Sequence, residues 1–167
     1  FKYNKRWPRE NPTFLFGRQH WDNVFWTLGS AVPVMTAYLV LTLWAMANGW
    51  VPMVAWADHP FYLVAVMLGV QLFRDVHFFA IHRLIHWPPL YRWVHALHHK
   101  NTNPGPWSGL AMHPVEHVLY FSSVLIHWIV PSHPLLVVYH LVAAAFGPAR
   151  DHCGLDRKST RLNSSHG

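Results

Sequence analysis

The sequence predicts an all-α integral membrane protein with about four membrane-embedded helical segments and a histidine-rich cap on the cytosolic side. Hydrophobic residues make up 52% of the 167-residue chain and charged residues only 12%, about half the usual share of charge. Long stretches carry no formal charge, and eight of the 15 histidines fall between residues 77 and 117. The composition therefore indicates a membrane protein, and the histidine spacing indicates where its functional site lies.

The first membrane segment is expected within residues 24–57, which contain no charged side chain. Residues 24–47 alone would form a helix of roughly 36 Å at about 1.5 Å per residue, which is enough to cross a bilayer with some tilt. Pro33 could kink this helix, and such a kink is tolerated in lipid. Residues 1–23 then form a cytosolic N-terminal segment.

The second segment begins with the apolar stretch 61–73, whose 13 residues are too few to cross a bilayer alone. A helix that continued through Asp75 to His86 would run about 26 residues and carry the first histidines beyond the membrane. The third stretch, residues 117–149, has 33 residues without a formal charge and is interrupted at residues 131–134. We interpret it as a helical hairpin, either tilted and partly cytosolic or re-entrant.

The placement of charge predicts the orientation. Basic residues outnumber acidic ones near the N-terminus and among the histidines, whereas the connection between the first two segments carries only Asp58. By the positive-inside rule, the N-terminus and the histidine motifs both face the cytoplasm. The net charge of +6 is ascribed to this orientation and not to nucleic-acid binding, because no basic stripe interleaved with aromatics is present. The single cysteine, Cys153, excludes an intramolecular disulfide and a cysteine-rich metal site.

Two histidine motifs dominate the sequence, His82-x-x-x-His86 and His95-x-x-His98-His99. Helix positions three and four apart share a face, so each motif is expected to direct its rings to one side. A short connection with two prolines separates the motifs. Imidazole suits iron, zinc, copper and nickel, whereas magnesium or calcium would need oxygen ligands. We interpret the motifs as half of a metal cage; the alternative is that some are ordinary surface or interface histidines.

Further elements accompany the two motifs between residues 75 and 116: Asp75, His82-Arg83, Tyr91-Arg92 leading into the second motif, and His113-Pro114. Together they resemble the fatty acid hydroxylase and sterol desaturase superfamily of integral-membrane di-iron oxygenases. Residues 150–154 look like that family's His-Ser-Gly element, with Cys153 in place of the usual serine. The family's further histidine cluster, downstream of that element, has no counterpart here. The family-like domain, residues 24–155, is therefore expected to be incomplete at its C-terminus.

The resemblance implies that the parent protein hydroxylates or desaturates a membrane lipid of sterol or fatty-acyl type, with O2 as co-substrate. It implies a non-haem centre of two iron ions. It also implies an external electron donor, such as a b-type cytochrome, a ferredoxin or a reductase, since the sequence carries no flavin, nicotinamide or haem motif. No catalytic residue separate from the metal centre is expected. The implied ligands are six histidines: His82, His86, His95, His98, His99 and His152.

Four other residues are candidates for further ligands or supporting roles. Asp75 lies two turns before the first motif on the same helical face and could orient a ligand imidazole; the alternative is a helix-end carboxylate facing water. His113 and His117 are considered as metal ligands or as partners of ligands, although a His-Pro pair such as that at His113 is first of all typical of a helix start. Trp107, in a loop rich in turn residues, could shape the substrate mouth or serve the turn itself.

Other histidines fall outside the predicted ligand set. His77 lies about 140° from His82 around a helix and is left out. His127 and His140 fall inside the apolar hairpin, where an ionisable side chain is a functional candidate. The alternative for both is a neutral histidine bonded to a backbone carbonyl.

The last residues, 156–167, differ abruptly in composition from the apolar domain before them. The string DRKSTRLNSSH resembles the translation of a widely used sequencing adapter, so this tail is interpreted as non-native; an ordinary disordered tail is the alternative. The truncated chain itself is expected to be inactive. The competing function is a membrane metal-binding or metal-transport protein, whose histidines should lie within the spans and not at their ends.

Overall fold

The structure is a computed structural model, and it describes residues 14–101, 105 and 107–151. Within these residues every regular element is a helix, and the one extended pairing is an isolated bridge between Met53 and Ser132. The all-α prediction is therefore confirmed for this part of the chain. The predicted ligand His152 and the tail 156–167 lie outside the described residues.

The first long helix runs without a break from Gln19 to Ala47. Its three parts are α1 (Gln19–Trp26), the π-helical η1 (Thr27–Ala31) and α2 (Val32–Ala47). Pro33 stands in the first turn of α2 and has no backbone N–H to donate to the preceding turn. A wider π turn lies directly before Pro33 and accommodates the missing hydrogen bond, so the helix continues without a break.

Helix α2 ends in a glycine cap. Gly49 adopts a left-handed φ of 72°, which glycine reaches without steric cost. Trp50 N donates to Ala45 O at 2.9 Å, and Gly49 N donates to Met46 O at 3.1 Å. These two bonds form a Schellman motif, which satisfies carbonyls that the end of the helix would leave unpaired.

Helix α3 (Pro60–Ile85) has the 26 residues that the sequence predicts for the second segment. It begins at a proline, whose fixed φ suits the first helical position. It ends before Trp87, whose extended ψ of 132° is the conformation that a following proline, Pro88, favours. The first histidine motif therefore lies on the last turn of a long helix.

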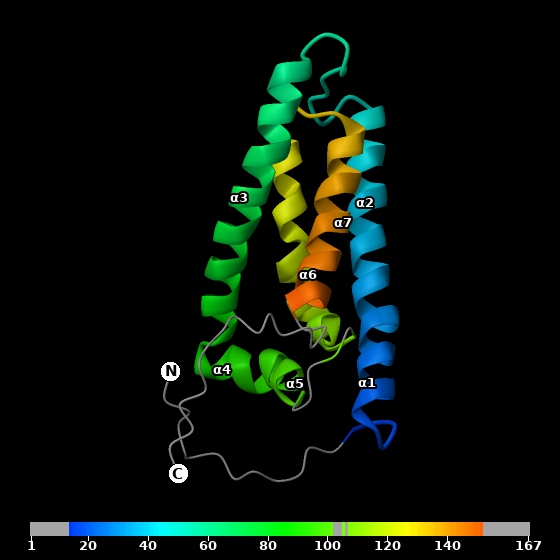
Figure 1. Cartoon of the computed structure of the whole chain (residues 1–167), viewed down its shortest axis with the longest axis vertical. Helices are drawn as coiled ribbons and strands as arrows, with labels where there is room; N and C mark the ends of the chain where they lie inside the picture. The colour runs from blue at the N-terminus through cyan, green and yellow to red at the C-terminus, as the bar shows by residue number, and fades with distance from the viewer. Residues whose placement is uncertain (1–13, 102–104, 106, 152–167) are drawn as a thin grey trace, which may run out of the picture.

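Four short helical segments follow α3. They are α4 (Pro88–Leu90), the π-helical η2 (Tyr91–His95), α5 (Ala96–His99) and the 3-10 helix η3 (Ser108–Leu110). Figure 1 shows that α4 and α5 run across the end of the long helices and not along them. The second histidine motif thus lies beneath the bundle, next to the end of α3.

The predicted hairpin consists of α6 (Pro114–Phe121), the 3-10 helix η4 (Ser122–Trp128) and α7 (Pro134–Asp151), and its break at residues 131–134 is confirmed. A 3-10 run of seven residues is unusually long. Two serines start it, and both donate to the carbonyl three residues earlier: Ser122 Oγ to Leu119 O at 2.7 Å, and Ser123 Oγ to Tyr120 O at 3.4 Å. Such bonds compete with the α-helical pattern.

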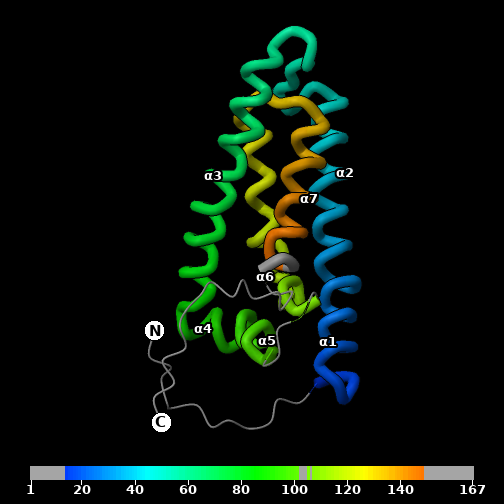
Figure 2. The backbone as a smooth tube through the Cα atoms, in the orientation of Figure 1, coloured from blue at the N-terminus to red at the C-terminus, as the bar shows by residue number. Residues whose placement is uncertain are grey.

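The hairpin fills the space between the two long helices. In Figures 1 and 2, α3 forms one side and α1–α2 the other, with α6 and α7 between them. The core is apolar and combines Ala45, Phe121, Val124, Val137 and Leu141, all at most 2% exposed. Polar side chains also tie the helices together: Tyr120 Oη donates to Ala144 O at 2.8 Å, and Trp128 Nε1 donates to Thr42 Oγ1 at 3.2 Å.

Two helices, Gln19–Ala47 and Pro60–Ile85, are long and apolar enough to cross a membrane. Helix Pro134–Pro148 is apolar but shorter. Much of the surface of α3 consists of exposed apolar side chains, which suits a lipid environment: Phe61, Leu68, Leu72, Val76 and Phe79. Length and composition thus support two of the roughly four membrane-embedded segments that the sequence predicts.

Candidate metal centre

The first histidine motif places two rings together at the end of α3. His82 and His86 are one helical turn apart, so they lie on the same face. Their Nε2 atoms are 3.1 Å apart and their ring centroids 4.6 Å apart. His82 is half-buried and His86 is exposed. The predicted pairing of these two histidines is therefore present in the structure.

The second motif begins in the π turn η2 and continues into α5. His95, the last residue of η2, is completely buried. Its Nε2 lies 3.0 Å from Nε2 of His99, and its ring stacks on that of His98 with centroids 5.5 Å apart. His98 Nδ1 also lies 3.4 Å from the carbonyl oxygen of Ala111. As the spacing predicts, His95 lies beside both later histidines.

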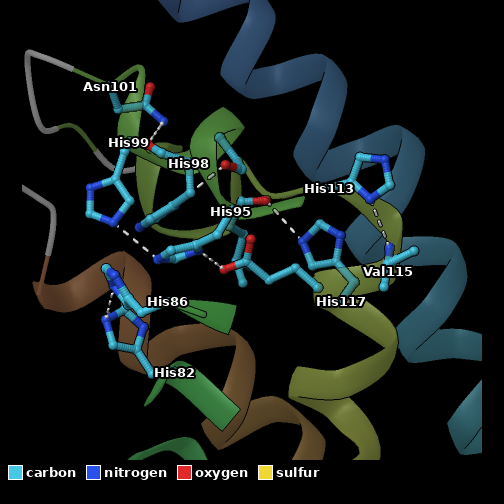
Figure 3. A network of polar contacts seen from close by, with 12 residues as sticks. His82, His86, His95, His98, His99, Asn101, His113, Val115 and His117 are labelled. Atoms are coloured by element: carbon cyan, nitrogen blue, oxygen red, sulfur yellow. Dashed lines mark hydrogen bonds and ion pairs between the residues drawn. The ribbon is translucent and has the colours of Figure 1, made fainter. Parts of the chain in front are cut away.

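The two motifs meet at His95, as Figure 3 shows. The ring centroid of His95 lies 5.0 Å from that of His82 and 4.7 Å from that of His86. The ring centroids of His86 and His99 are 5.3 Å apart. One ring nitrogen from each of His82, His86 and His95 lies within 4.8 Å of the others. Metal–imidazole bonds of about 2.0–2.1 Å place neighbouring ligand nitrogens about 3 Å apart. The Nε2–Nε2 distances of 3.0 and 3.1 Å therefore fit a site for a metal ion.

The environment favours neutral imidazoles, which is the form that binds metals. Burial, with a smaller contribution from the neighbouring His86, lowers the pKa of His95 to about 4. Burial also lowers the pKa of His99 to about 4, with added effects of His95, His86 and His82. Both rings therefore keep a lone pair available at neutral pH.

A buried carboxyl group, Glu116, completes this arrangement. Its Oε1 lies 2.8 Å from His95 Nδ1, and the two side chains are only 3% and 1% exposed. Burial raises the pKa of Glu116 to about 8, although His113 and His86 act in the opposite direction. Its other oxygen, Oε2, is buried with no hydrogen-bond partner among the described residues. Sequence reasoning missed this residue, because no spacing rule connects positions 21 apart on different elements.

The candidates His113 and His117 lie next to the cluster but do not join it. Both ring nitrogens of His117 are engaged: Nε2 lies 3.1 Å from Leu110 O and Nδ1 lies 2.8 Å from Ser30 Oγ. His113 Nδ1 accepts a hydrogen bond from Val115 N at 3.2 Å and caps α6. The prediction of a helix start at this His-Pro pair is confirmed.

Asp75 and Trp107 also lie apart from the histidine cluster. The carboxylate of Asp75 is 71% exposed and lies 3.6 Å from the guanidinium of Arg74. The backbone carbonyl of Trp107 accepts a hydrogen bond from Thr27 Oγ1 at 3.2 Å, and its side chain is 38% exposed. Neither contact brings these side chains to a ring of the cluster.

The hairpin histidines form a separate buried chain of hydrogen bonds. His127 Nδ1 lies 2.8 Å from Ser132 Oγ, and its Nε2 lies 3.2 Å from His140 Nδ1. His140 Nε2 in turn lies 2.9 Å from Ser123 Oγ. All four side chains are at most 1% exposed. Their partners are side chains, whereas the sequence suggested backbone carbonyls as the alternative to a functional role.

Comparison with known proteins matches this chain to fatty acid hydroxylases and to sterol desaturases. The family model of the fatty acid hydroxylases matches residues 64–166. A delta(7)-sterol 5(6)-desaturase of Gibberella zeae is 44% identical over 57 residues, which are 34% of this chain and 17% of the relative. A fatty acid hydroxylase of Mycosarcoma maydis is 36% identical over 63 residues, 38% of this chain and 16% of the relative.

A delta(7)-sterol 5(6)-desaturase of Candida glabrata aligns over a longer part of the chain. It is 29% identical over 118 residues, 68% of this chain and 31% of the relative. The chain therefore spans between 16% and 31% of the length of these three relatives. No solved structure matches it.

Proposed function

Because the chain belongs to the fatty acid hydroxylase family, we propose that the parent protein is a membrane oxidoreductase that hydroxylates or desaturates a lipid of sterol or fatty-acyl type. The reaction uses O2 as co-substrate. One observation supports the proposal above all: His82, His86, His95 and His99 converge at the end of two apolar helices. The relatives named as sterol desaturases and a fatty acid hydroxylase suggest the class of substrate.

We assign the metal centre to the histidines of the two motifs and to His152. A non-haem pair of iron ions, when bound, would supply the activation of O2 and the removal of hydrogen from an unactivated C–H bond. The residues present fit such an ion, because neutral imidazoles are suitable ligands for iron. The role of the protein is to hold the rings in place and to exclude water from them. The proposed ligands are His82, His86, His95, His98, His99 and His152.

The surroundings of the site suit a lipid substrate and a separate electron donor. The exposed apolar side chains of α3 extend along the helix that carries the first motif, so a lipid can approach from the bilayer. Arg83, Arg92 and Lys100 are exposed near the histidines. By the positive-inside rule these charges favour a cytoplasmic site, on the same side as the N-terminus. We propose that a b-type cytochrome, a ferredoxin or a reductase delivers electrons there.

The experiment is reconstitution of the full-length parent protein, with the C-terminal part that this chain lacks, in lipid nanodiscs with ferrous iron, a sterol or a fatty-acyl lipid, and a reducing system. Iron per chain is measured together with product mass, which gains one oxygen atom on hydroxylation and loses two hydrogens on desaturation. Replacement of His98 by alanine should remove iron and product, whereas His20→Ala, at an exposed histidine outside the cluster, should retain both.

Two outcomes would contradict the proposal. Full iron content and turnover in His98→Ala would overturn the ligand assignment. Metal uptake into sealed vesicles, without any oxidised lipid, would favour the competing function of metal transport.

A further inference from the structure

We propose that Glu116 is a positioning residue of the metal centre. Its carboxylate accepts a hydrogen bond from Nδ1–H of His95 and so holds the ring with Nε2 directed at the metal. The inference rests on the proposed function, because it takes His95 as a ligand. It adds to the histidine set a residue of another type, on another helix.

The two nitrogens of His95 face opposite partners. Nδ1 lies 2.8 Å from Glu116 Oε1, and Nε2 lies 3.0 Å from Nε2 of His99. A neutral imidazole carries one N–H and one lone pair. If the N–H is on Nδ1, where Glu116 can accept it, the lone pair is on Nε2 inside the cluster. Carboxylates that fix ligand histidines in this way also make the imidazole a stronger donor to the metal.

The other carboxylates whose side chains the structure describes do not contact the cluster. Asp22 accepts a hydrogen bond from Leu15 N at 3.0 Å, and Asp58 is exposed in the connection after α2. Asp75, the residue that the sequence suggests for this role, is exposed and faces Arg74. Glu116 alone among them lies within hydrogen-bond distance of a cluster histidine.

The protein compensates the burial of Glu116 only in part, because His95 Nδ1 contacts one of its two carboxyl oxygens. A buried carboxyl group is costly unless it is paired and hydrogen-bonded. Glu116 is 3% exposed, and its Oε2 has no partner among the described residues. A metal ion bound at Nε2 of His95 would polarise this ring and strengthen its Nδ1–H hydrogen bond to the Glu116 carboxyl group. The contact therefore fits a group that orients a metal ligand.

The helix turn that carries Glu116 is held firmly in place. Glu116 lies in the first turn of α6, which His113 caps through Val115 N. The next residue, His117, is fixed to Ser30 of η1 and to the carbonyl of Leu110. A group that orients a ligand must itself be held by its surroundings. These contacts of its neighbours provide that support.

The test is a Co²⁺ titration of the detergent-solubilised chain, followed by visible absorbance. Glu116→Leu removes the acceptor at similar volume, and Glu116→Gln keeps an acceptor without the charge. We expect Glu116→Leu to weaken Co²⁺ binding by about 10–100-fold and Glu116→Gln to give an intermediate value. The control is Asp22→Asn, at a buried carboxylate outside the site, which should bind as the wild type does.

Melting of the metal-free protein separates positioning from a structural role. Glu116→Leu leaves the buried Nδ1 of His95 without an acceptor, so this metal-free variant should melt lower than the wild type. Glu116→Gln keeps an acceptor, so it should melt close to the wild type, and a weaker Co²⁺ affinity in that variant reports positioning and not a loss of the fold. Equal affinities and equal Co²⁺ spectra in all variants would overturn the proposal. If Glu116→Leu fails to fold, an unchanged affinity and spectrum in Glu116→Gln overturns it equally. Failure of the wild type to bind Co²⁺ would instead overturn the ligand set of the proposed function.

Discussion

The histidines at the end of α3 and those inside the α6–α7 hairpin are both closely packed, but they use their ring nitrogens differently. In the hairpin, each nitrogen of His127 and His140 has a partner that can complement it, a serine hydroxyl or the other ring. In the cluster, Nε2 faces Nε2 twice, at 3.1 Å between His82 and His86 and at 3.0 Å between His95 and the ring of His99.

This difference shows how one residue type can serve two purposes. A neutral imidazole has one donor and one acceptor, so the serine-ended chain in the hairpin satisfies both on each ring without any further group. In the cluster, ring nitrogens from several elements lie close together, and a metal ion could bind them jointly. The hairpin chain therefore fits a structural role, and the cluster fits a ligand set.

The largest expected effect is the loss of metal binding in His95→Ala. His95 is the ring at which both motifs meet, so its removal leaves the contact between His86 and His99, whose ring centroids are 5.3 Å apart, to join the two motifs. We expect Co²⁺ and iron stoichiometry, measured by elemental analysis after gel filtration, to fall to background. Wild-type stoichiometry in His95→Ala would show that the metal is held elsewhere.

In the hairpin, His140→Ala should lower the stability of the protein without changing its metal binding. It removes the middle of the buried chain and leaves Ser123 and His127 without their partner. An unsatisfied buried polar group costs about 1–3 kcal/mol, so the variant should melt at a lower temperature while its metal stoichiometry stays unchanged. Loss of metal with unchanged melting would contradict the comparison, because it would make His140 part of the metal centre.

Much of the helical layout could be predicted from the sequence, because it depends on local signals. The apolar run up to the first histidine motif predicts the 26 residues of α3, and the Pro-Ser-His-Pro break predicts the hairpin. Spacing of three and four also predicts the pairing of rings within each motif. These features require only the helical period and the conformational limits of proline.

The contacts between distant elements could not be predicted in the same way. Asp75 does lie about two turns before His82, but its carboxylate is 71% exposed and lies 3.6 Å from the guanidinium of Arg74. Glu116 meets His95 only because α6 packs beside η2, and no pattern in the sequence encodes this packing. The π turns η1 and η2 likewise have no local signature that the composition reveals.

A smaller effect is expected from Ser30→Ala, which tests the support of the site and not its ligands. Ser30 Oγ lies 2.8 Å from Nδ1 of His117 in a buried contact between η1 and α6. Its loss should destabilise the protein by about 1–3 kcal/mol, because His117 keeps an unpaired buried nitrogen. Chemical denaturation measures this change, and Co²⁺ affinity should weaken by less than in Glu116→Leu. A weaker affinity than in Glu116→Leu would make His117 itself a ligand.

The smallest expected effect concerns pH. Protons compete with metal for imidazole, and binding weakens only as the pH falls below the pKa of each ligand. Because the pKa values of His95 and His99 are lowered to about 4, these two rings stay neutral at mildly acidic pH. Their contribution to Co²⁺ affinity should therefore change little from neutral pH down to about pH 5.5.

A free peptide with the sequence of residues 95–99 is the matched control, because it has the same histidines without the burial. Its imidazoles should titrate near the ordinary pKa of 6.5, so its Co²⁺ binding should fall steeply over the same interval. The lowered pKa arises mainly from burial among the neighbouring helices, and the folded chain should therefore differ from the peptide. If the folded protein and the peptide lose Co²⁺ in parallel, the cluster is open to water. The contrast with the buried hydrogen bonds of His127 and His140 would then rest on the geometry of the ring nitrogens alone.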